Sequence, residues 1–233
     1  MFVTNEIQNY FDKANRIVFM TGAGVSTASG IPDYRSKNGL YTNNQQLKPE
    51  FLLSATALKN IPEFQYKFMK DNMYFPNAKP NIIHQKMAEF SNIGKAITIT
   101  QNVDNLHLML DPTVIEFHGN LYRIYEAESR KPASWQEYLI SQYKNGKLLR
   151  PDITLYEEIP QHINDAQSAV TQADLIVIVG TSFQVYPFAG LLSYASSNAK
   201  VISINLEKIL TSFHVQQIIV DAKDFFAELQ VTK

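Results

Sequence analysis

Five short apolar runs, each too short to form a helix of ordinary length, most constrain the fold of this chain. They occupy residues 16–20, 96–100, 114–117, 174–180 and 200–205. Runs of this length that are rich in Ile and Val are typical of strands buried on both faces of a parallel sheet. Residues 7–15 and 80–90 show the spacing of helices, and they precede the runs at 16–20 and 96–100. The sequence therefore predicts an α/β fold, a Rossmann-like parallel sheet with helices on both faces.

Two other stretches break this alternation and predict a small inserted lobe. Residues 47–75 are rich in Phe, Leu, Met and Tyr and are broken by prolines, which predicts several short helices. Residues 121–150 are polar and aromatic with several basic side chains. We therefore predict a single domain over residues 1–233. Its Rossmann part covers about 1–35, 80–119 and 150–233, and its small-lobe insertions cover about 36–79 and 120–149.

Composition excludes several classes of function. With 21 basic and 22 acidic residues the net charge is -1, so no general attraction to nucleic acid or to anionic membranes is expected. The chain contains no cysteine, which removes disulfides, catalytic thiols and thiolate metal sites. No apolar run reaches the roughly 18 residues that suggest a membrane span, and the first residues do not resemble a signal peptide. We expect a cytoplasmic protein, and the sequence does not predict its oligomeric state.

Polar clusters follow three of the predicted strands, at residues 21–35, 101–107 and 180–187. In parallel α/β sheets, ligands bind beyond the carboxyl ends of the strands. We therefore expect the three clusters to converge on one crevice.

Each cluster taken alone has an ordinary explanation beside the functional one. Gly22-Ala23-Gly24 could bring backbone N–H groups to a pyrophosphate, but a tight turn that serves only packing explains it equally well, because the third glycine of the dinucleotide motif would fall at Thr27. Asp33 and Arg35 could hold ribose and phosphate oxygens or form a surface ion pair. Gln101, Asn102 and Asp104 could bind a carboxamide and a ribose or form a solvated turn. His118, which follows a strand, could be a general base or a structural histidine.

Taken together, the clusters resemble the sirtuin (Sir2) family in order and spacing. The matching segments are Gly22–Ser26 with Gly30–Arg35, Thr100–Asp104 with Leu106 and His107, His118 with Gly119, Leu149–Asp152, Gly180–Ser182 with Val185 and Pro187, and Ile204 with Asn205. The match spans about residues 15–225, and half a dozen separate motifs are unlikely to coincide by accident.

The resemblance implies an NAD-consuming protein-lysine deacylase that releases nicotinamide and O-acyl-ADP-ribose, with NAD in a crevice between the Rossmann part and the small lobe. In sirtuins the acyl oxygen attacks the ribose carbon as nicotinamide leaves, and a histidine then deprotonates a ribose hydroxyl. His118 matches that histidine, and Asn102 and Asp104 match the pocket for nicotinamide and its ribose. The residues that match NAD contacts are Gly22, Ala23, Gly24, Ser26, Ile31, Asp33, Tyr34, Arg35, Gln101, Gly180, Thr181, Ser182 and Asn205. Ile31 and Tyr34 would shield the reacting carbon from water.

The partner implied by the resemblance is an acyl-lysine protein or peptide. The residues that match its binding site are Tyr66, Met69, Ile153, Thr154, Leu155, Tyr156 and Val185. Thr154 and Glu157 depart from the family's usual substrate segment. In sirtuins that prefer succinyl or malonyl groups an Arg stands at the position of Met69, so acetyl or longer neutral acyl groups are expected here.

A further departure concerns the zinc ion that sirtuins usually hold through two cysteine pairs. Glu126, Ser129, Ser141 and Lys144 stand near those four positions and cannot build a thiolate site. We expect a zinc-lacking lobe that is held by packing, through Trp135, Tyr138, Leu139 and Tyr143. The alternatives to a deacylase are a protein ADP-ribosyltransferase or NAD glycohydrolase on the same fold, or an NAD or ADP-ribose sensor without catalysis.

Overall fold

The computed structural model describes residues 2–33 and 47–232, and within them a six-stranded parallel sheet forms the larger part of the molecule. The strands are β1 (Ile17–Thr21), β2 (Ala96–Thr100), β3 (Ile115–Glu116), β8 (Leu175–Val179), β9 (Lys200–Asn205) and β10 (Gln216–Ile219). Their order across the sheet is β10-β9-β8-β1-β2-β3. All five residues of both β1 and β8 are buried, which is why these runs are continuously apolar.

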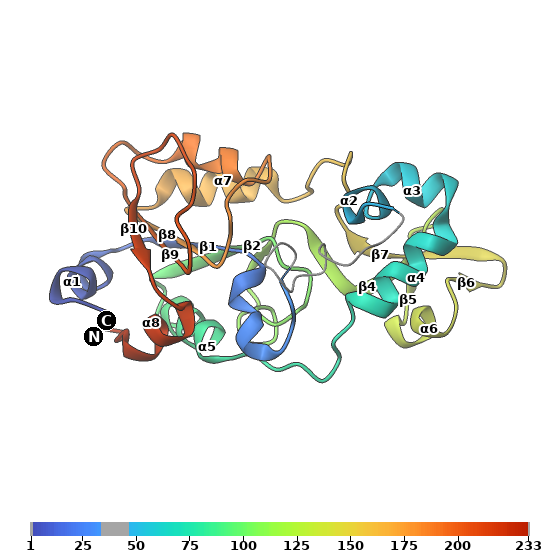
Figure 1. Cartoon of the computed structure of the whole chain (residues 1–233), viewed down its shortest axis with the longest axis horizontal. Helices are drawn as coiled ribbons and strands as arrows, with labels where there is room; N and C mark the ends of the chain where they lie inside the picture. Colours follow the sequence, from blue (N-terminus) through green and yellow to red (C-terminus); the bar gives the residue numbers. More distant parts are fainter. Residues whose placement is uncertain (1, 34–46, 233) are drawn as a thin grey trace.

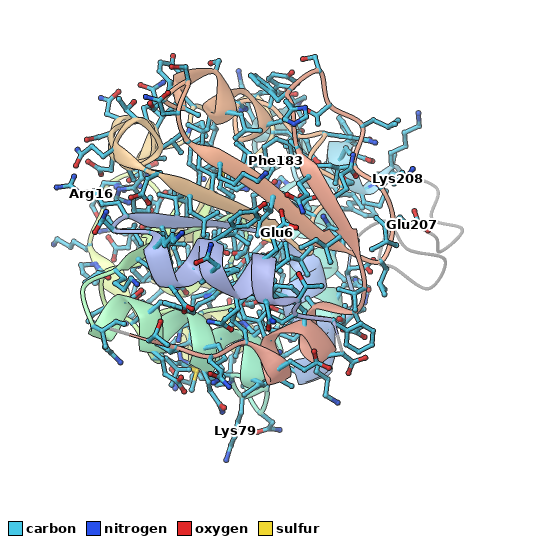
Figure 2. The ribbon with its side chains drawn as sticks, turned by 90° about the vertical axis from the view of Figure 1, so that its left-hand side faces the viewer. Glu6, Arg16, Lys79, Phe183, Glu207 and Lys208 are labelled. Carbon is cyan, nitrogen blue, oxygen red and sulfur yellow. The ribbon has the colours of Figure 1, made fainter. Side chains whose placement is uncertain are left out.

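Helices cover both faces of this sheet, as the sequence predicts (Figures 1 and 2). On one face lie α1 (Asn5–Lys13), α5 (Ile82–Asn92) and α8 (Ala222–Glu228), and on the other lie α7 (Ile163–Gln172) and the 3₁₀ helix η3 (Ala189–Tyr194). Alternate side chains of β1 serve the two faces, since Phe19 joins the first core while Val18 and Met20 join the second. Phe19 packs with Phe11, Phe90 and Phe226 at ring-centroid distances of 5.9 to 6.4 Å.

The smaller part is an antiparallel sheet with a group of short helices, here called the small lobe. Its strands are β4 (Gly119–Glu126), β5 (Pro132–Ala133), β6 (Tyr143–Lys144) and β7 (Lys147–Ile153), in the order β5-β4-β7-β6. Its helices are α2 (Pro49–Leu52), α3 (Ala55–Asn60), α4 (Pro62–Asn72) and α6 (Trp135–Ile140). The antiparallel sheet begins one residue after His118. It therefore extends slightly beyond the predicted insertion at both ends.

An aromatic cluster holds the outer end of the small lobe together. The Tyr138 ring packs edge-on against Tyr66, with ring centroids 5.1 Å apart, and also contacts Tyr74. Trp135 packs edge-on against Tyr122. Of the residues predicted to hold this lobe, Trp135, Tyr138 and Leu139 join the cluster, whereas Tyr143 is 43% exposed on β6.

Side-chain caps fix where several helices begin. The side chain of Thr4 caps α1 and that of Asp221 caps α8. At α5, Asn81 and His84 form a reciprocal capping box. Within the described residues, no helix is both long and apolar enough to cross a membrane.

Candidate active site

A cleft of about 730 Å³ opens at the carboxyl ends of β1, β2, β8 and β9 and continues to the small lobe. The chain runs outward from β1 in one direction to β2 and β3, and in the other direction to β8, β9 and β10. Such a reversal of strand order is where ligands bind in open α/β sheets. The three polar clusters predicted to converge do meet here, since residues of all three line the cleft.

The glycine-bearing turn after β1 lines the cleft, and two of its backbone N–H groups have the packing role that was one of the two sequence-based explanations. The N–H groups of Gly22 and Gly24 donate to the carbonyls of Val179 and Gly180, at 3.1 and 2.8 Å. A Cβ on Gly24 would lie 2.8 Å from the Cα of Gly180. These two N–H groups thus connect the turn to the end of β8 and the residue after it, and they are not free to donate to a pyrophosphate. The turn continues into two short 3₁₀ helices, η1 (Ala23–Val25) and η2 (Thr27–Ser29), and not into a regular helix.

A hydrogen-bonded triad connects this turn to the loop after β2. The Ser26 hydroxyl donates to Asp104 Oδ2 at 2.6 Å and accepts from Asn102 Nδ2 at 3.1 Å. Asp104 Oδ1 accepts from the Leu106 N–H at 2.9 Å. Burial raises the pKa of the Asp104 carboxyl, although these hydrogen bonds oppose the shift. Asn102 lines the cleft, so Ser26 and Asp104 hold its amide from behind.

A second chain of hydrogen bonds crosses the tops of β2, β8 and β9. Gln101 Nε2 donates to Thr181 Oγ1 at 3.1 Å, and the Thr181 N–H donates to Asn205 Oδ1 at 2.9 Å. All three residues line the cleft. Asn205 Nδ2 is buried without a hydrogen-bond partner among the described residues. An amide donor left without a partner is costly, so this atom is available to a ligand oxygen or a water molecule.

His118 reaches the cleft from the junction between the two parts of the molecule. Its Nδ1 lies 3.3 Å from the Gln101 carbonyl, and its ring packs edge-on against Phe117. Because a carbonyl only accepts, the neutral ring carries its proton on Nδ1 and leaves Nε2 as the basic atom. Burial lowers the pKa of His118 to about 4, opposed by the hydrogen bond to Gln101. The imidazole is therefore neutral and able to accept a proton at pH 7.

The predicted substrate segment lies next to this histidine. The Thr154 N–H donates to the His118 carbonyl at 2.8 Å, and the Tyr156 N–H donates to the Leu53 carbonyl at 2.9 Å. Ile153, Thr154, Leu155 and Tyr156 all line the cleft, as does Val185.

The structure brings most of the predicted site residues to one cavity. The lining residues among them are Gly22, Ala23, Gly24, Asp33, Gln101, Asn102, His118, Gly180, Thr181, Ser182, Asn205, Ile153, Thr154, Leu155, Tyr156 and Val185. Ser26 and Asp104 lie in the layer behind, and the Ile31 N–H contacts the Ser26 carbonyl. Tyr34 and Arg35 lie outside the described residues.

Two predicted substrate residues sit elsewhere. Neither Tyr66 nor Met69 is among the described residues that line the cleft; Met69 is 1% exposed and lies in the core of the small lobe. Met73, which follows the last residue of α4, lines the cleft instead. Sequence reasoning also missed Leu53, Val103 and the segment 206–210. That segment follows β9 at the same edge of the sheet, a signal that could have identified it.

The four positions where sirtuins usually carry zinc ligands form ordinary polar contacts here. Glu126 accepts hydrogen bonds from Ser129 and from Lys147, Ser141 donates to the Tyr143 carbonyl, and Lys144 pairs with Glu137 at 2.9 Å. An ammonium group cannot bind a cation, so these residues do not fit zinc. Over the described ranges, no group of three or more His, Asp or Glu side chains is placed to hold a metal ion.

Comparison with known proteins identifies the family. Residues 22–187 match the model of the Sir2 family, and the chain belongs to that family. It is 47% identical over 229 residues to an NAD-dependent protein deacetylase of Lactiplantibacillus plantarum, covering 96% of this chain and 97% of that protein. A protein of the same description from Listeria monocytogenes is 45% identical over 230 residues, covering 97% of this chain and 100% of its own.

Solved structures of Sir2 proteins have the same fold. A Sir2 complex with a p53 peptide and NAD⁺ superposes with a TM-score of 0.83 at 28% identity, covering 96% of this chain and 95% of the other. Another, with a deacetylated p53 peptide and 3′-O-acetyl ADP-ribose, gives 0.84 at 29% identity, with 95% of both chains covered.

Proposed function

We propose that this protein is an NAD-dependent protein-lysine deacetylase that transfers the acetyl group to ADP-ribose and releases nicotinamide. The observation that carries the proposal is the position of His118. Its neutral imidazole lines a cleft between the two parts of the molecule, which Asn102 and Thr154 also line, and the Thr154 N–H is bonded to the His118 carbonyl. The relatives described as NAD-dependent protein deacetylases support the same activity.

The residues at the top of the sheet fit an NAD molecule. Asn205 Nδ2, which lacks a partner, and the Thr181 and Ser182 side chains offer donors for ribose and phosphate oxygens. Asn102 would bind the carboxamide of nicotinamide, and Asp104 would act next to it at the ribose. In this proposal Gly22 and Gly24 contribute by allowing Gly180 to approach, rather than by donating their own N–H groups.

His118 would act as the general base. NAD supplies the electrophilic ribose carbon, which the acetyl oxygen attacks as nicotinamide departs. His118 Nε2 would then take the proton of a ribose hydroxyl, while the hydrogen bond from Nδ1 to the Gln101 carbonyl keeps the ring oriented and steadies the positive charge that develops.

We further propose that the acyl group is acetyl or a longer neutral chain and that the small lobe functions without zinc. The acyl end of the cleft is lined by apolar side chains, including Leu53, Met73, Val103 and Ile153. Met69, at the position that carries an Arg in sirtuins selective for acidic acyl groups, is buried in the core of the small lobe and is not among the described residues that line the cleft, so it offers no donor to a carboxylate there. The aromatic cluster around Tyr138 supports a metal-free lobe.

One assay tests the activity against its alternatives. The protein is incubated with NAD and an acetyl-lysine peptide, and the ribose product is identified by mass spectrometry. We expect O-acetyl-ADP-ribose, with nicotinamide release that requires the acetylated peptide. Nicotinamide release of equal rate without peptide would indicate an NAD glycohydrolase, and a peptide carrying ADP-ribose would indicate a transferase. Either result would contradict the proposal.

A further inference from the structure

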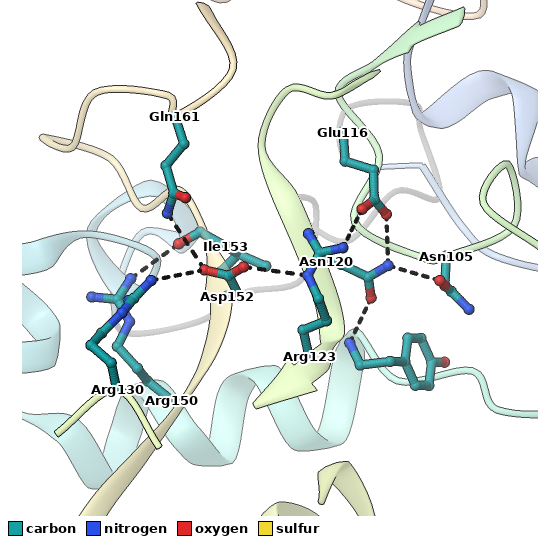
Figure 3. Close-up of polar contacts among 10 residues, drawn as sticks. Asn105, Glu116, Asn120, Arg123, Arg130, Arg150, Asp152, Ile153 and Gln161 are labelled. Atoms are coloured by element: carbon teal, nitrogen blue, oxygen red, sulfur yellow. Dashed lines mark hydrogen bonds and ion pairs between the residues drawn. The ribbon is translucent and has the colours of Figure 1, made fainter. Parts of the chain in front are cut away.

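Asn120, two residues after His118, is buried at the centre of a polar network beneath the cleft (Figure 3). It is 1% exposed. Its Nδ2 donates to Asn105 Oδ1 at 2.8 Å and to Glu116 Oε1 at 2.6 Å, and its Oδ1 accepts from the Tyr122 N–H at 2.8 Å. The side chain therefore joins the loop after β2, the strand β3 and the start of β4.

The orientation of this amide is determined by its surroundings. The Tyr122 backbone N–H can only donate, so the Asn120 oxygen must face it. The amide nitrogen then faces two acceptors, the Glu116 carboxylate and the side-chain oxygen of Asn105. Glu116 is itself held, because its second oxygen accepts from Arg123 Nη1 at 2.5 Å. Each polar atom of Asn120 thus has a partner and one orientation.

The contact with Asn105 matters because the backbone of Asn105 forms a turn next to Asp104. Asn105 has a φ of 71°, in the left-handed region that asparagine adopts more readily than most residues. The turn made there brings the Leu106 N–H to Asp104 Oδ1, and Asp104 in turn holds Ser26 and, through it, Asn102. The Leu121 N–H also donates to the Val103 carbonyl at 2.9 Å, so the loop is tied to β4 on both sides of Asp104.

The same network extends to the strand that leads into the substrate segment. Arg123 bridges Glu116 and Asp152, with its Nε 3.3 Å from Asp152 Oδ2. Arg130 lies 3.7 Å from the other Asp152 oxygen, and Asp152 immediately precedes Ile153 (Figure 3). One connected set of side chains therefore lies behind both the Asn102–Asp104 loop and β7.

We propose that Asn120 is a positioning residue for the nicotinamide end of the NAD site, which it serves by fixing Asn105 and thereby the Asp104 carboxylate and the Asn102 amide. The proposal rests on the proposed function, because Asn102 and Asp104 are assigned to NAD there. Asn120 does not line the cleft, so it acts through these residues and does not touch substrate.

The test is Asn120→Asp, which keeps the shape of the side chain, removes both donated hydrogen bonds and places a second carboxylate against Glu116. We expect NAD affinity, measured by calorimetric titration, and kcat/KM for NAD each to fall about tenfold, as expected from lost hydrogen bonds and a shifted loop. The KM for the acetyl-lysine peptide should stay within about twofold.

A second substitution provides the rescue. In the double variant with Glu116→Gln, the new amide at position 116 can donate to the new carboxylate at position 120, and the Asn105 amide can rotate to do the same. We expect NAD affinity to recover to within about threefold of the original protein. Should Asn120→Asp not fold, Asn105→Gly keeps the positive φ while removing the acceptor, and we expect it to weaken NAD binding in the same way.

Val170→Ala is the control for a merely structural effect. Val170 is fully buried in the core between α7 and the larger sheet and is not a member of the network, so its truncation should lower the melting temperature without changing NAD affinity. Unchanged NAD affinity in Asn120→Asp, or a loss that Glu116→Gln does not reverse, would overturn the proposal. NAD affinity is measured without peptide. If the protein shows no deacetylase activity, the effect of Asn120→Asp on NAD binding can therefore still be interpreted.

Discussion

We expect two buried histidines beside the end of β1 to make the stability of this protein depend strongly on pH. The rings of His84 and His107 lie 4.5 Å apart and are 1% and 5% exposed. His107 Nε2 contacts Thr21 Oγ1 at 3.1 Å, and His84 Nδ1 accepts from the Asn81 N–H at 3.3 Å in the capping box of α5. Burial lowers the pKa of His107 to about 3 and that of His84 well below its ordinary value, with the neighbouring His107 adding to the effect on His84.

The direction and size of the effect follow from proton linkage. Both histidines are neutral in the folded protein, whereas in the unfolded chain they take up protons near pH 6.5. The unfolded state therefore binds more protons below pH 6.5, and folding stability falls as pH falls from there toward the folded-state pKa values. At pH 5 each histidine removes about 2 kcal/mol, so the pair removes about 4 kcal/mol. That is a large part of the roughly 5 to 15 kcal/mol that stabilises an ordinary domain.

The variant His84→Gln isolates one half of this effect. Glutamine at this helix position can still accept from the Asn81 N–H and complete the capping box, but it does not titrate. The free energy of unfolding is measured by urea denaturation at pH 7.5 and at pH 5. The loss of unfolding free energy between these two pH values should be about 2 kcal/mol smaller in His84→Gln than in the original protein. The exposed His214→Gln is the matched control and should leave the pH difference unchanged. An equal pH difference in His84→Gln and the original protein would refute the reasoning.

Three further predictions concern the site and the small lobe. His118→Ala should lower deacetylation by about 10² to 10⁴ while NAD affinity stays within a few fold, as expected for loss of a general base, and unchanged turnover would remove His118 from the mechanism. Treatment with a chelator should leave the melting temperature unchanged, whereas a loss that zinc but not magnesium restores would reveal a metal site. On matched peptides, kcat/KM should be higher for acetyl- or butyryl-lysine than for succinyl-lysine, and the opposite order would point to Lys67 or Lys70 on α4 as a partner for the acid group.

The larger sheet could be predicted from the sequence because its strands are buried on both faces. Residues 96–100 and 200–205 coincide with β2 and β9, and the runs at 16–20 and 174–180 overlap β1 and β8, whose residues are all buried. A strand covered by helices on both sides is largely apolar and ends where polar residues begin. By contrast, β10 (Gln216–Ile219) was missed because it is an edge strand with partly exposed side chains. The pairing of β4 with β7 was also missed, since it depends on contacts between segments about 30 residues apart whose side chains alternate between polar and apolar.

In the cleft, the sequence predicted which residues are present better than it predicted the contacts that their atoms make. For the Gly22-Ala23-Gly24 turn, pyrophosphate binding and packing were equally good explanations, and two of its N–H groups prove to bond to β8 and the loop after it. No sequence pattern can reveal that Gly180 approaches Gly24 so closely, because the contact joins segments far apart in the chain. Similarly, the family resemblance placed Met69 at the acyl group, whereas it lies on α4 in the core of the small lobe.

The junction at His118 and Gly119 joins the two halves of the cleft. Gly119 has a φ of +81°, and a Cβ on it would lie 2.0 Å from the Asp152 carbonyl oxygen, so only glycine allows β4 to leave the sheet edge and pair with β7 at this point. That pairing places the Thr154 N–H on the His118 carbonyl. The histidine proposed to act at the ribose is thereby bonded directly to the segment proposed to hold the acyl-lysine. This backbone hydrogen bond, together with the pairing of β4 and β7, links the geometry of the two halves of the cleft.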